Sequence, residues 1–312
     1  MSEKSLSFVI PVYNEAESVK LLHNKIVENI QGYSYEIIFI DDGSNDNSYQ
    51  ELEKIREKDE NVKIIKLRTN FGKSVALQAG FDKAQGDIIF TIDADLQDDP
   101  KEIPNFLNKL NEGYDLVVGW KKRREDPLSK KIPSKLFNFI TSRAFHLKLH
   151  DYNCGFKAYT KEAAKSLNIY GELHRYIPAM ANANGFKVTE ISVVHHKRSY
   201  GISKYGSERF LRGFLDLLTV MLVTKYGMSP LYLFGMAGVL TFLIGIIINL
   251  YLAIGKIFFG FSLSNRPLLF LGVLLVIVGM QFISIGLLGE MIVHRTKRLE
   301  TKPDYYIEKI VQ

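Results

Sequence analysis

The segment Leu6-Ser7-Phe8-Val9-Ile10-Pro11-Val12-Tyr13-Asn14-Glu15 is a short apolar run that ends in polar residues. The same pattern recurs along the first 120 residues, where apolar runs alternate with charged segments of helix length. The runs are residues 6–13, 35–40, 62–67, 87–92 and 115–119, and the segments between them are 16–31, 48–58, 73–85 and 102–112. Near-continuous apolar strands separated by amphipathic helices predict an α/β fold with a mostly parallel sheet covered on both faces.

The polar residues that follow these runs are the first candidates for a site, because such a sheet binds ligands beyond the carboxyl ends of its strands. The first run ends in Tyr13-Asn14-Glu15, the second in Asp41-Asp42-Gly43-Ser44, and the fourth in Asp93-Ala94-Asp95-Leu96-Gln97-Asp98-Asp99. Three acidic clusters at one edge concentrate like charge, which a divalent cation would offset. The competing interpretation is that some of these residues cap helices, which we favour for Asp98 and Asp99 and keep open for Asn14 and Glu15.

Two familiar nucleotide-binding signatures are missing. No Gly-x-Gly-x-x-Gly follows the first run, which argues against dinucleotide binding. The sequence Gly72-Lys73-Ser74 resembles the end of a P-loop, but Leu67 stands where the upstream glycine is required. The phosphate cradle of an ATPase is therefore incomplete.

The composition bounds the class of protein. The chain has 312 residues, one Cys and a net charge of +6, from 40 Lys and Arg against 34 Asp and Glu. A single Cys cannot form an internal disulfide, and the 46% hydrophobic content is that of a folded chain. The positive charge is compatible with nucleic acid, an anionic membrane surface or a phosphorylated substrate.

Two long uncharged stretches follow, at residues 226–255 and 267–289. At about 1.5 Å per helical residue, each can cross a hydrocarbon core of roughly 30 Å, so we predict two transmembrane helices at about 231–255 and 267–289. Buried core helices are the alternative. Basic residues follow the second stretch, whereas the loop between the stretches has only Lys256 and Arg266. The positive-inside rule therefore predicts that the N-terminal portion and the tail are cytosolic. The first apolar run is too short for a signal peptide.

Basic residues gather in two further segments, 121–135 and 195–204, beside predicted interfacial amphipathic helices at 133–147 and 207–226. A solvated surface is the default interpretation of such segments. A basic patch beside interfacial helices fits a lipid phosphate better than nucleic acid, so we expect no nucleic-acid partner.

In combination, Val9-Ile10-Pro11-Val12-Tyr13-Asn14-Glu15, Asp41-Asp42-Gly43-Ser44, Asn70-Phe71-Gly72-Lys73 and Asp93-Ala94-Asp95 resemble the family-2 glycosyltransferases with the Rossmann-like GT-A fold. With the terminal hairpin, the chain is similar to polyprenyl-phosphate glycosyltransferases, such as the bacterial undecaprenyl-phosphate glucosyltransferases and dolichyl-phosphate mannosyltransferase. The expected domains are a cytosolic GT-A domain (1–205), a juxtamembrane amphipathic helix (206–228), a membrane region (229–291) and a basic cytosolic tail (292–312).

The donor side of the predicted site uses the first, second and fourth runs. An apolar wall, an aromatic ring and carboxylates suit a base and ribose. A carboxylate and an amide oxygen two residues apart suit one Mg²⁺ or Mn²⁺ ion, which would neutralise a diphosphate leaving group. The resemblance also implies that the first Asp and the Ala of the triplet contact the nucleotide. The expected donor residues are Pro11, Tyr13, Glu15, Ile40, Asp42, Asp93, Ala94 and Asp95, and the expected metal ligands are Asp95 and Gln97.

On the acceptor side, the resemblance implies phosphate binding by Arg198 and Lys204, by Lys121 or Lys122, and by Lys130 with Ser134. The last three basic positions are Lys where relatives usually have Arg, and Lys lacks the bidentate fork. Asp151 matches an Asp-x-x-x-Gly-Phe-Arg-like segment of relatives and is a candidate catalytic carboxylate with Asp95. Its alternative is a turn-forming loop residue.

We therefore expect inverting, metal-dependent transfer of a sugar from a nucleotide sugar to a polyprenyl phosphate such as undecaprenyl phosphate, with UDP-glucose as the favoured donor. Transfer of mannose from GDP-mannose is the alternative, and UDP-linked amino sugars or arabinose derivatives are further candidates. A processive polysaccharide synthase usually has a Gln-x-x-Arg-Trp segment, which is absent here, and a non-catalytic binder would be expected to lose Asp93 or Asp95. The hairpin is also compatible with a homo-oligomer.

Overall fold

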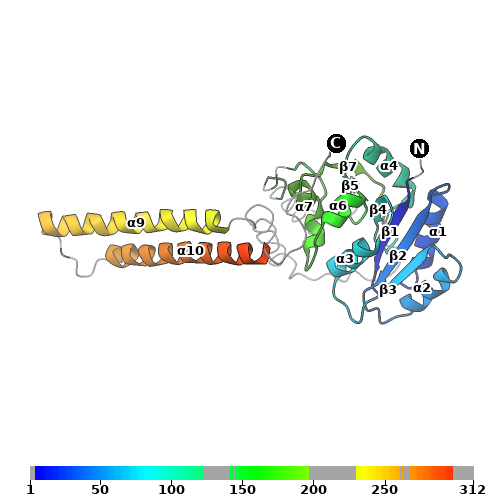
Figure 1. Ribbon diagram of the computed structural model, residues 1–312, viewed down its shortest axis with the longest axis horizontal. Coiled ribbons are helices and arrows are strands. Elements are labelled where there is room, and N and C mark those ends of the chain that lie inside the picture. Colours follow the sequence, from blue (N-terminus) through cyan, green and yellow to red (C-terminus); the bar gives the residue numbers. More distant parts are fainter. Residues whose placement is uncertain are drawn as a thin grey trace. The chain divides into compact units, whose positions relative to one another are not determined.

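The computed structural model describes residues 4–122, 141–143, 145, 147–196, 230–260, 262 and 267–297. The chain divides into two compact units, residues 1–217 and residues 218–312, and each is considered separately (Figure 1). The predicted domain boundaries at 205 and 228 lie outside the described residues and stay predictions. So do the interfacial helix of 207–226 and most of that of 133–147.

The first unit is built on a mixed sheet of seven described strands in the order β3-β2-β1-β4-β6-β5-β7. β1 pairs in parallel with β2 and β4, β2 with β3, and β5 with β7, whereas β6 is antiparallel to both of its neighbours. The predicted mostly parallel sheet is confirmed, and all five predicted runs form strands. The strands are β1 (Leu6–Val12), β2 (Tyr35–Asp41), β3 (Val62–Lys66), β4 (Ile88–Thr91), β5 (Leu116–Trp120), β6 (Lys157–Thr160) and β7 (Val188–Ser192).

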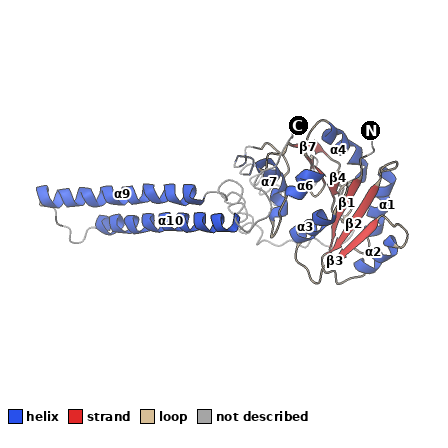
Figure 2. Cartoon of the chain, viewed as in Figure 1, coloured by secondary structure: helices blue, strands red, loops and turns tan. Residues whose placement is uncertain are grey.

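Helices cover both faces of this sheet (Figures 1 and 2). Each has an apolar side at helical spacing; in α4, for example, Ile103, Phe106, Leu107 and Leu110 are buried. Phe106 of α4 packs edge-on against Phe90 of β4, while on the opposite face Gly80 of α3 lies against Val9 of β1. One face carries α1 (Val19–Asn29), α2 (Ser48–Arg56) and α4 (Ile103–Asn111), and the other carries α3 (Lys73–Lys83), α6 (Lys161–Ser166) and α7 (Ile177–Ala183).

The second unit is a helical hairpin of α9 (Pro230–Phe259) and α10 (Pro267–Lys297). Both helices are long and apolar enough to cross a membrane. Glycines form their contact: a Cβ at Gly238 would lie 2.7 Å from the carbonyl oxygen of Gly279, and one at Gly245 would lie 2.8 Å from that of Gly272. Close backbone approach at small residues is a common way for helices to pack in lipid.

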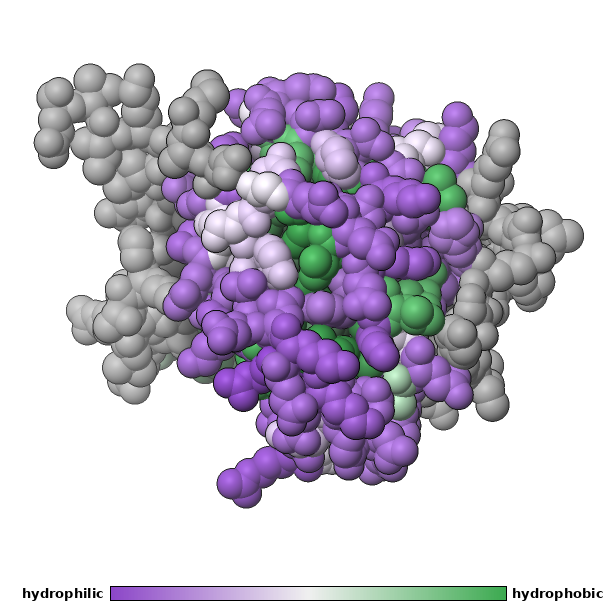
Figure 3. Space-filling view, turned by 90° about the vertical axis from the view of Figure 1, so that its right-hand side faces the viewer, coloured by the Kyte–Doolittle hydropathy of each residue, from purple (hydrophilic) through white to green (hydrophobic). Residues whose placement is uncertain are grey.

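The surfaces of the two units differ accordingly. Figure 3 shows one face of the first unit, which is mostly hydrophilic, with hydrophobic residues visible at depth between the polar ones. On the hairpin, by contrast, large apolar side chains such as Ile247, Phe258 and Phe270 are exposed. This inverted distribution is expected for helices solvated by lipid.

Candidate active site

The carboxyl ends of β2, β1 and β4 lie side by side, because these strands are neighbours and run parallel. Asp41 ends β2 and is in register with Val12 at the end of β1. Asp93 follows β4 by two residues. The acidic clusters predicted from the sequence therefore meet at one edge of the sheet.

Residues 69–73, which are the end of the connection from β3 and the first residue of α3, hold two of these carboxylates. The Oδ1 and Oδ2 atoms of Asp42 accept hydrogen bonds from the backbone N–H groups of Phe71 (2.8 Å) and Gly72 (2.9 Å). The Nζ atom of Lys73 pairs with Oδ1 of Asp93 at 2.5 Å. Because Asp42 follows β2 and Asp93 follows β4, this segment reaches across the end of β1. We call residues 69–73 with Asp42 and Asp93 the clamped half of the site.

Two glycines make this arrangement possible. Gly72 has a φ of +92°, a conformation that strongly favours glycine, and it directly precedes α3. Gly43 has a φ of +69°, and a Cβ there would lie 2.5 Å from the carbonyl carbon of Thr69. The glycine in the sequence Asp42-Gly43 is thus explained by the close approach of the segment that holds Asp42.

Electrostatics differ between the two clamped carboxyl groups. Burial raises the pKa of Asp42, and the hydrogen bonds from Phe71 and Gly72 only partly oppose this effect. Burial also acts to raise the pKa of Asp93, but the charge of Lys73 and its hydrogen bond outweigh it, so the pKa of Asp93 is lowered. Asp93 is therefore ionised at neutral pH.

The loop after β1 is fixed against the loop after β2. Asn14 has a φ of 53°, its Oδ1 accepts from the N–H of Asn45 at 2.8 Å, and its own N–H donates to Oγ of Ser44 at 3.0 Å. The N–H of Glu15 donates to Oγ of Ser48 at 2.8 Å. Because α1 begins only at Val19, the predicted helix start at Ala16 is wrong, and the side chain of Asn14 does not cap the helix. The carbonyl oxygen of Glu15 accepts from the N–H groups of Ser18 and Val19 at 3.1 and 3.2 Å, so Glu15 does lie at the turn that leads into α1.

The other predicted donor residues lie at this edge with different exposure. Pro11 and Tyr13 are half-buried at the end of β1. Pro11 is in register with Ile40, whose side chain is fully buried, so only the main chain of Ile40 can face a ligand. Ala94 is also buried, at 4% exposure.

Asp95 and Gln97 form a second region, which we call the open half of the site. Between them, Leu96 has a φ of 60°, and the N–H of Gln97 donates to Oδ1 of Asp95 at 3.2 Å. Gln97 is held by His196: its carbonyl oxygen accepts from the N–H of His196 at 2.8 Å, and its Nε2 donates to the carbonyl oxygen of His196 at 3.4 Å. With Nε2 engaged in this way, Oε1 is the atom that Gln97 offers to a ligand.

The carboxyl group of Asp95 carries negative charge that its surroundings do not balance. Burial, followed by the charges of Asp93 and Asp98, raises the pKa of Asp95 to about 6. A bound cation would relieve this repulsion. The carboxylate of Asp95 and the amide oxygen of Gln97 are the hard oxygen ligands that Mg²⁺ and Mn²⁺ prefer, so the residues fit such an ion.

The protein part of this metal site is small. In the described residues, no three His, Cys, Asp or Glu side chains converge as a metal-binding group. An ion at Asp95 and Gln97 would therefore need further oxygen ligands from a substrate or from water, which is common for Mg²⁺ sites that also bind phosphates.

The two acidic residues that we expected to cap a helix behave differently. Asp99 caps the short helix η1 (Pro100–Glu102), because its Oδ1 accepts from the N–H of Lys101 at 3.1 Å. Asp98 does not cap, so that expectation is wrong. It is 2% exposed, and its Oδ1 lies 3.2 Å from Nζ of Lys121 and 3.6 Å from Nδ1 of His195. Burial acts to raise the pKa of Asp98, but the charge of Lys121 and the contact with His195 outweigh it, so the pKa of Asp98 is lowered.

The predicted phosphate-binding residues are only partly described. Lys121 has a side chain 13% exposed and is paired with Asp98, whereas Lys122 is exposed and its Nζ lies 5.6 Å from the ring centre of Trp120. Of the two, Lys122 is the one accessible to a phosphate. Lys130, Ser134, Arg198 and Lys204 lie outside the described residues.

Asp151 is 1% exposed, and its Oδ1 accepts from the N–H of Asn153 at 3.0 Å. It lies near the site, since its charge acts on Lys121 and Lys157. The hydrogen bond with Asn153 agrees with a turn-forming residue. The catalytic role of Asp151 stays a prediction.

Several residues at the site were not predicted from the sequence. Lys73 pairs with Asp93, although the sequence showed it only as part of Asn70-Phe71-Gly72-Lys73. Gly155 packs against Asp93 so closely that a Cβ would overlap its carboxylate. Lys157 is 4% exposed and donates to the carbonyl oxygen of Cys154, and burial lowers its pKa to about 8. The sequence Gly155-Phe156-Lys157, which matches the Gly-Phe-Arg-like segment of relatives, was the signal that could have identified Gly155 and Lys157 as site residues.

Comparison with known proteins agrees with this geometry. A family model described as "Glycosyl transferase family 2" matches residues 7–167. The chain is 38% identical to dodecaprenyl-phosphate galacturonate synthase of Rhizobium johnstonii, over 98% of this chain and 92% of that protein. It is 36% identical to undecaprenyl-phosphate 4-deoxy-4-formamido-L-arabinose transferase of Pseudomonas fluorescens, over 98% of this chain and 90% of that one.

Solved structures with the same fold include glucosyl-3-phosphoglycerate synthase of Mycobacterium tuberculosis in complex with Mn²⁺, UDP-glucose and phosphoglyceric acid. The TM-score is 0.55 at 18% identity, and the match covers 69% of this chain and 80% of that one. This likeness is one of fold and identifies the sheet with its helices as a GT-A domain.

Proposed function

Since this chain belongs to glycosyl transferase family 2, among its polyprenyl-phosphate glycosyltransferases, we propose that it transfers a sugar from a UDP-sugar to a polyprenyl phosphate at the cytosolic face of a membrane. The observation that carries the proposal is the edge of the sheet where Asp42 and Asp93 are held by residues 69–73 beside the unbalanced carboxyl group of Asp95. The two apolar helices of the hairpin support an integral membrane protein.

On the donor side, Asp42 and Glu15 accept hydrogen bonds from the ribose or the base, and Pro11 and Tyr13 flank the base. Asp93 and the main chain at Ala94 contact the nucleotide from the opposite side. The clamped half supports this role, because groups that are already fixed lose little conformational entropy when a ligand binds.

Asp95 and Gln97 would hold a divalent ion, Mg²⁺ or Mn²⁺, which supplies positive charge to the diphosphate as the bond to the anomeric carbon breaks. The raised pKa of Asp95 supports this assignment, because burial and the charges of Asp93 and Asp98 destabilise its ionised form, and a bound cation would stabilise that form.

On the acceptor side, a phosphate monoester has its second pKa near about 6 and is largely a dianion at neutral pH. One of its oxygens attacks the anomeric carbon, the bond to the diphosphate breaks, and the configuration inverts. Because the nucleophile is already ionised, a strong general base is unnecessary. Lys122, with Lys130, Ser134, Arg198 and Lys204, is proposed to bind this phosphate and to reduce its repulsion from the diphosphate.

The names of the relatives change the donor sugar that we propose. They are named for galacturonate and for 4-deoxy-4-formamido-L-arabinose, so the preference for glucose has no specific support. We propose a UDP-linked uronic acid or a 4-amino-4-deoxypentose derivative ahead of UDP-glucose, with GDP-mannose as the remaining alternative. The orientation, with the first unit and the tail in the cytosol, rests on the basic residues after the second apolar stretch.

The test is an assay of membranes that contain the full chain. UDP-galacturonate, UDP-4-deoxy-4-formamido-L-arabinose, UDP-glucose and GDP-mannose are supplied separately with undecaprenyl phosphate and Mg²⁺, and lipid-extractable sugar is measured. We expect one UDP-sugar of the first two to give product, and the product to be lost when Mg²⁺ is chelated.

Product from UDP-glucose alone would reject the preference for a uronic acid or a 4-amino-4-deoxypentose derivative. Product from GDP-mannose alone would reject the UDP donor, and product that resists chelation would reject the metal. No lipid-linked product from any donor would reject the proposed reaction.

A further inference from the structure

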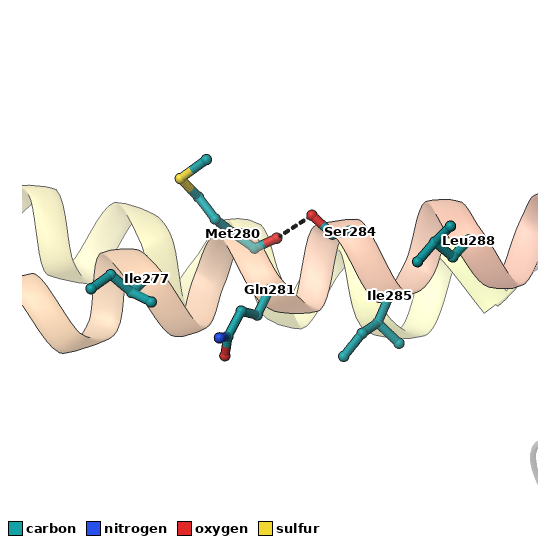
Figure 4. A pocket seen from close by; sticks show the side chains of 6 residues that line it. All are labelled: Ile277, Met280, Gln281, Ser284, Ile285 and Leu288. Atoms are coloured by element: carbon teal, nitrogen blue, oxygen red, sulfur yellow. Dashed lines mark hydrogen bonds between the residues drawn. The ribbon is translucent and has the colours of Figure 1, made fainter.

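The outer side of α10 carries polar residues in an apolar helix. Gln281 and Ser284 are exposed and line a shallow groove together with four apolar residues of the same helix (Figure 4). We call this set the Gln281 groove, and its members are Ile277, Met280, Gln281, Ser284, Ile285 and Leu288.

The depth of Gln281 makes its side chain notable. The apolar span of α10 runs from Pro267 to Val293, and Gln281 lies near its middle. At about 1.5 Å per residue, both ends of the span are roughly 20 Å away, so Gln281 lies close to the centre of a bilayer. Polar side chains at this depth are costly unless they have a partner, and they normally face protein rather than lipid.

The hairpin itself does not provide that partner. Gly272, Gly279 and Gly286 of α10 lie against α9. Gln281 is two residues beyond Gly279, which turns it about 160° away from this contact. In the described part of the chain, the amide of Gln281 has no hydrogen-bond partner, whereas Oγ of Ser284 donates to the carbonyl oxygen of Met280 at 2.9 Å. The hydroxyl is thus satisfied locally and the amide is not.

We propose that the Gln281 groove is the contact surface for a second copy of this chain, with the two Gln281 amides hydrogen-bonded to each other. A twofold interface brings identical positions together. A carboxamide suits such a position, because it both donates and accepts and is therefore complementary to its own copy. Lipid and polyprenyl chains offer no hydrogen-bonding groups at this depth. The small Ser284, one turn away, lets the two helices approach closely.

The first experiment is disulfide cross-linking of the full chain in membranes. In a Cys154→Ala background, which removes the one native Cys, Gln281→Cys is compared with Leu240→Cys. Leu240 is 62% exposed on α9, between Gly238 and Phe242, which both contact Gly279, so it matches Gln281 in depth and differs in face. Under mild oxidation we expect a covalent homodimer from Gln281→Cys at several times the yield from Leu240→Cys. Equal yields at the two positions, or cross-links only to another protein, would overturn the proposal.

The second experiment tests the amide itself. Self-association of the full chain is measured by energy transfer between labelled copies as they are diluted in lipid vesicles. Gln281→Leu should weaken association about 3- to 20-fold, the range for one interhelical hydrogen bond in a membrane, and Gln281→Asn should weaken it less. A Leu240→Ala variant serves as the control for a change on the other exposed face. If Gln281→Leu associates as tightly as the unmodified chain, the proposal is wrong.

Discussion

The two halves of the candidate site hold their carboxylates in different ways. In the clamped half, Asp42 receives two backbone N–H groups and Asp93 receives the ammonium group of Lys73. In the open half, the described structure gives Asp95 one hydrogen bond, from the N–H of Gln97, and surrounds it with the charges of Asp93 and Asp98. The carboxylates of the clamped half are therefore already balanced by groups of the protein, whereas the open half would gain its balancing charge from the cation that we propose there.

Removal of the open carboxylate should have the largest effect. Asp95→Ala should lower kcat for lipid-linked sugar formation by about 10²- to 10³-fold or more, because the cation that stabilises the leaving group loses its charged ligand. Glu51→Ala is the control, since Glu51 pairs with Lys54 at 2.7 Å on α2, outside the site, and its loss should leave most of the activity. An Asp95→Ala enzyme with nearly full activity would remove the distinction between the two halves.

A smaller loss is expected from release of the clamp. Lys73→Met should lower kcat/KM for the donor about 10- to 100-fold, because Asp93 loses a charged hydrogen-bond partner. Lys63→Met is the control, as Lys63 pairs with Glu36 at 2.6 Å near the start of β2 and should change activity little. Equal effects of the two substitutions on the donor kcat/KM would show that Lys73 acts only on the stability of the fold.

The pH dependence of metal binding should distinguish the halves further. A proton and a cation compete for Asp95, whose pKa is about 6. The affinity for Mn²⁺ alone, measured by electron paramagnetic resonance, should therefore fall by about tenfold per pH unit below pH 6 and level off above it. Asp95→Asn should bind Mn²⁺ weakly without this slope, and an unchanged slope would assign the titration to another group.

The smallest expected effect is on thermal stability, which substitutions of Asp95 and Asp93 should change in opposite directions. The folded-state pKa of Asp95 lies above its ordinary value, so the ionised group opposes folding as pH rises through that range to about 6. The pKa of Asp93 is lowered, so its ionised form stabilises the fold above the ordinary value, and this contribution is lost as pH falls. At pH 7.5 without metal, Asp95→Asn should raise Tm by about 2–4 °C and Asp93→Asn should lower it by a similar amount. Shifts of the same sign would contradict the comparison.

The sequence predicted the parts of the fold with a strong local signal. The five apolar runs are strands whose ends lie within one residue of the predicted ends. The two predicted transmembrane segments lie in the two helices of the hairpin. β6 was missed because only Ala158 and Tyr159 lie between its polar ends, Lys157 and Thr160. β7 was missed because Val188–Ser192 lies half-exposed at the edge of the sheet and includes Thr189 and Glu190. Neither strand shows the apolar run that marks a buried parallel strand.

The site was predicted in position but not in its contacts. Residues at the ends of β1, β2 and β4 were identified because chain order fixes which ends meet. The pairs Lys73–Asp93 and Asp98–Lys121 join residues 20 or more positions apart, and no local pattern announces such a pair. Asp98 was therefore interpreted as a helix cap. In the structure it pairs instead with Lys121, the residue that directly follows β5.

The position of β6 sets the order in which the protein can mature during synthesis. β4 and β5 follow each other in the chain, but β6 lies between them in the sheet. During translation, the first four strands can pair as they emerge from the ribosome. β5 can join the sheet only after residues 157–160, which form the strand between β4 and β5, have been synthesised. Gly155, which packs against Asp93, emerges just before that strand, and His196, which holds Gln97, emerges after it. A nascent chain therefore cannot assemble the site until residue 196 has left the ribosome, shortly before the first apolar helix follows.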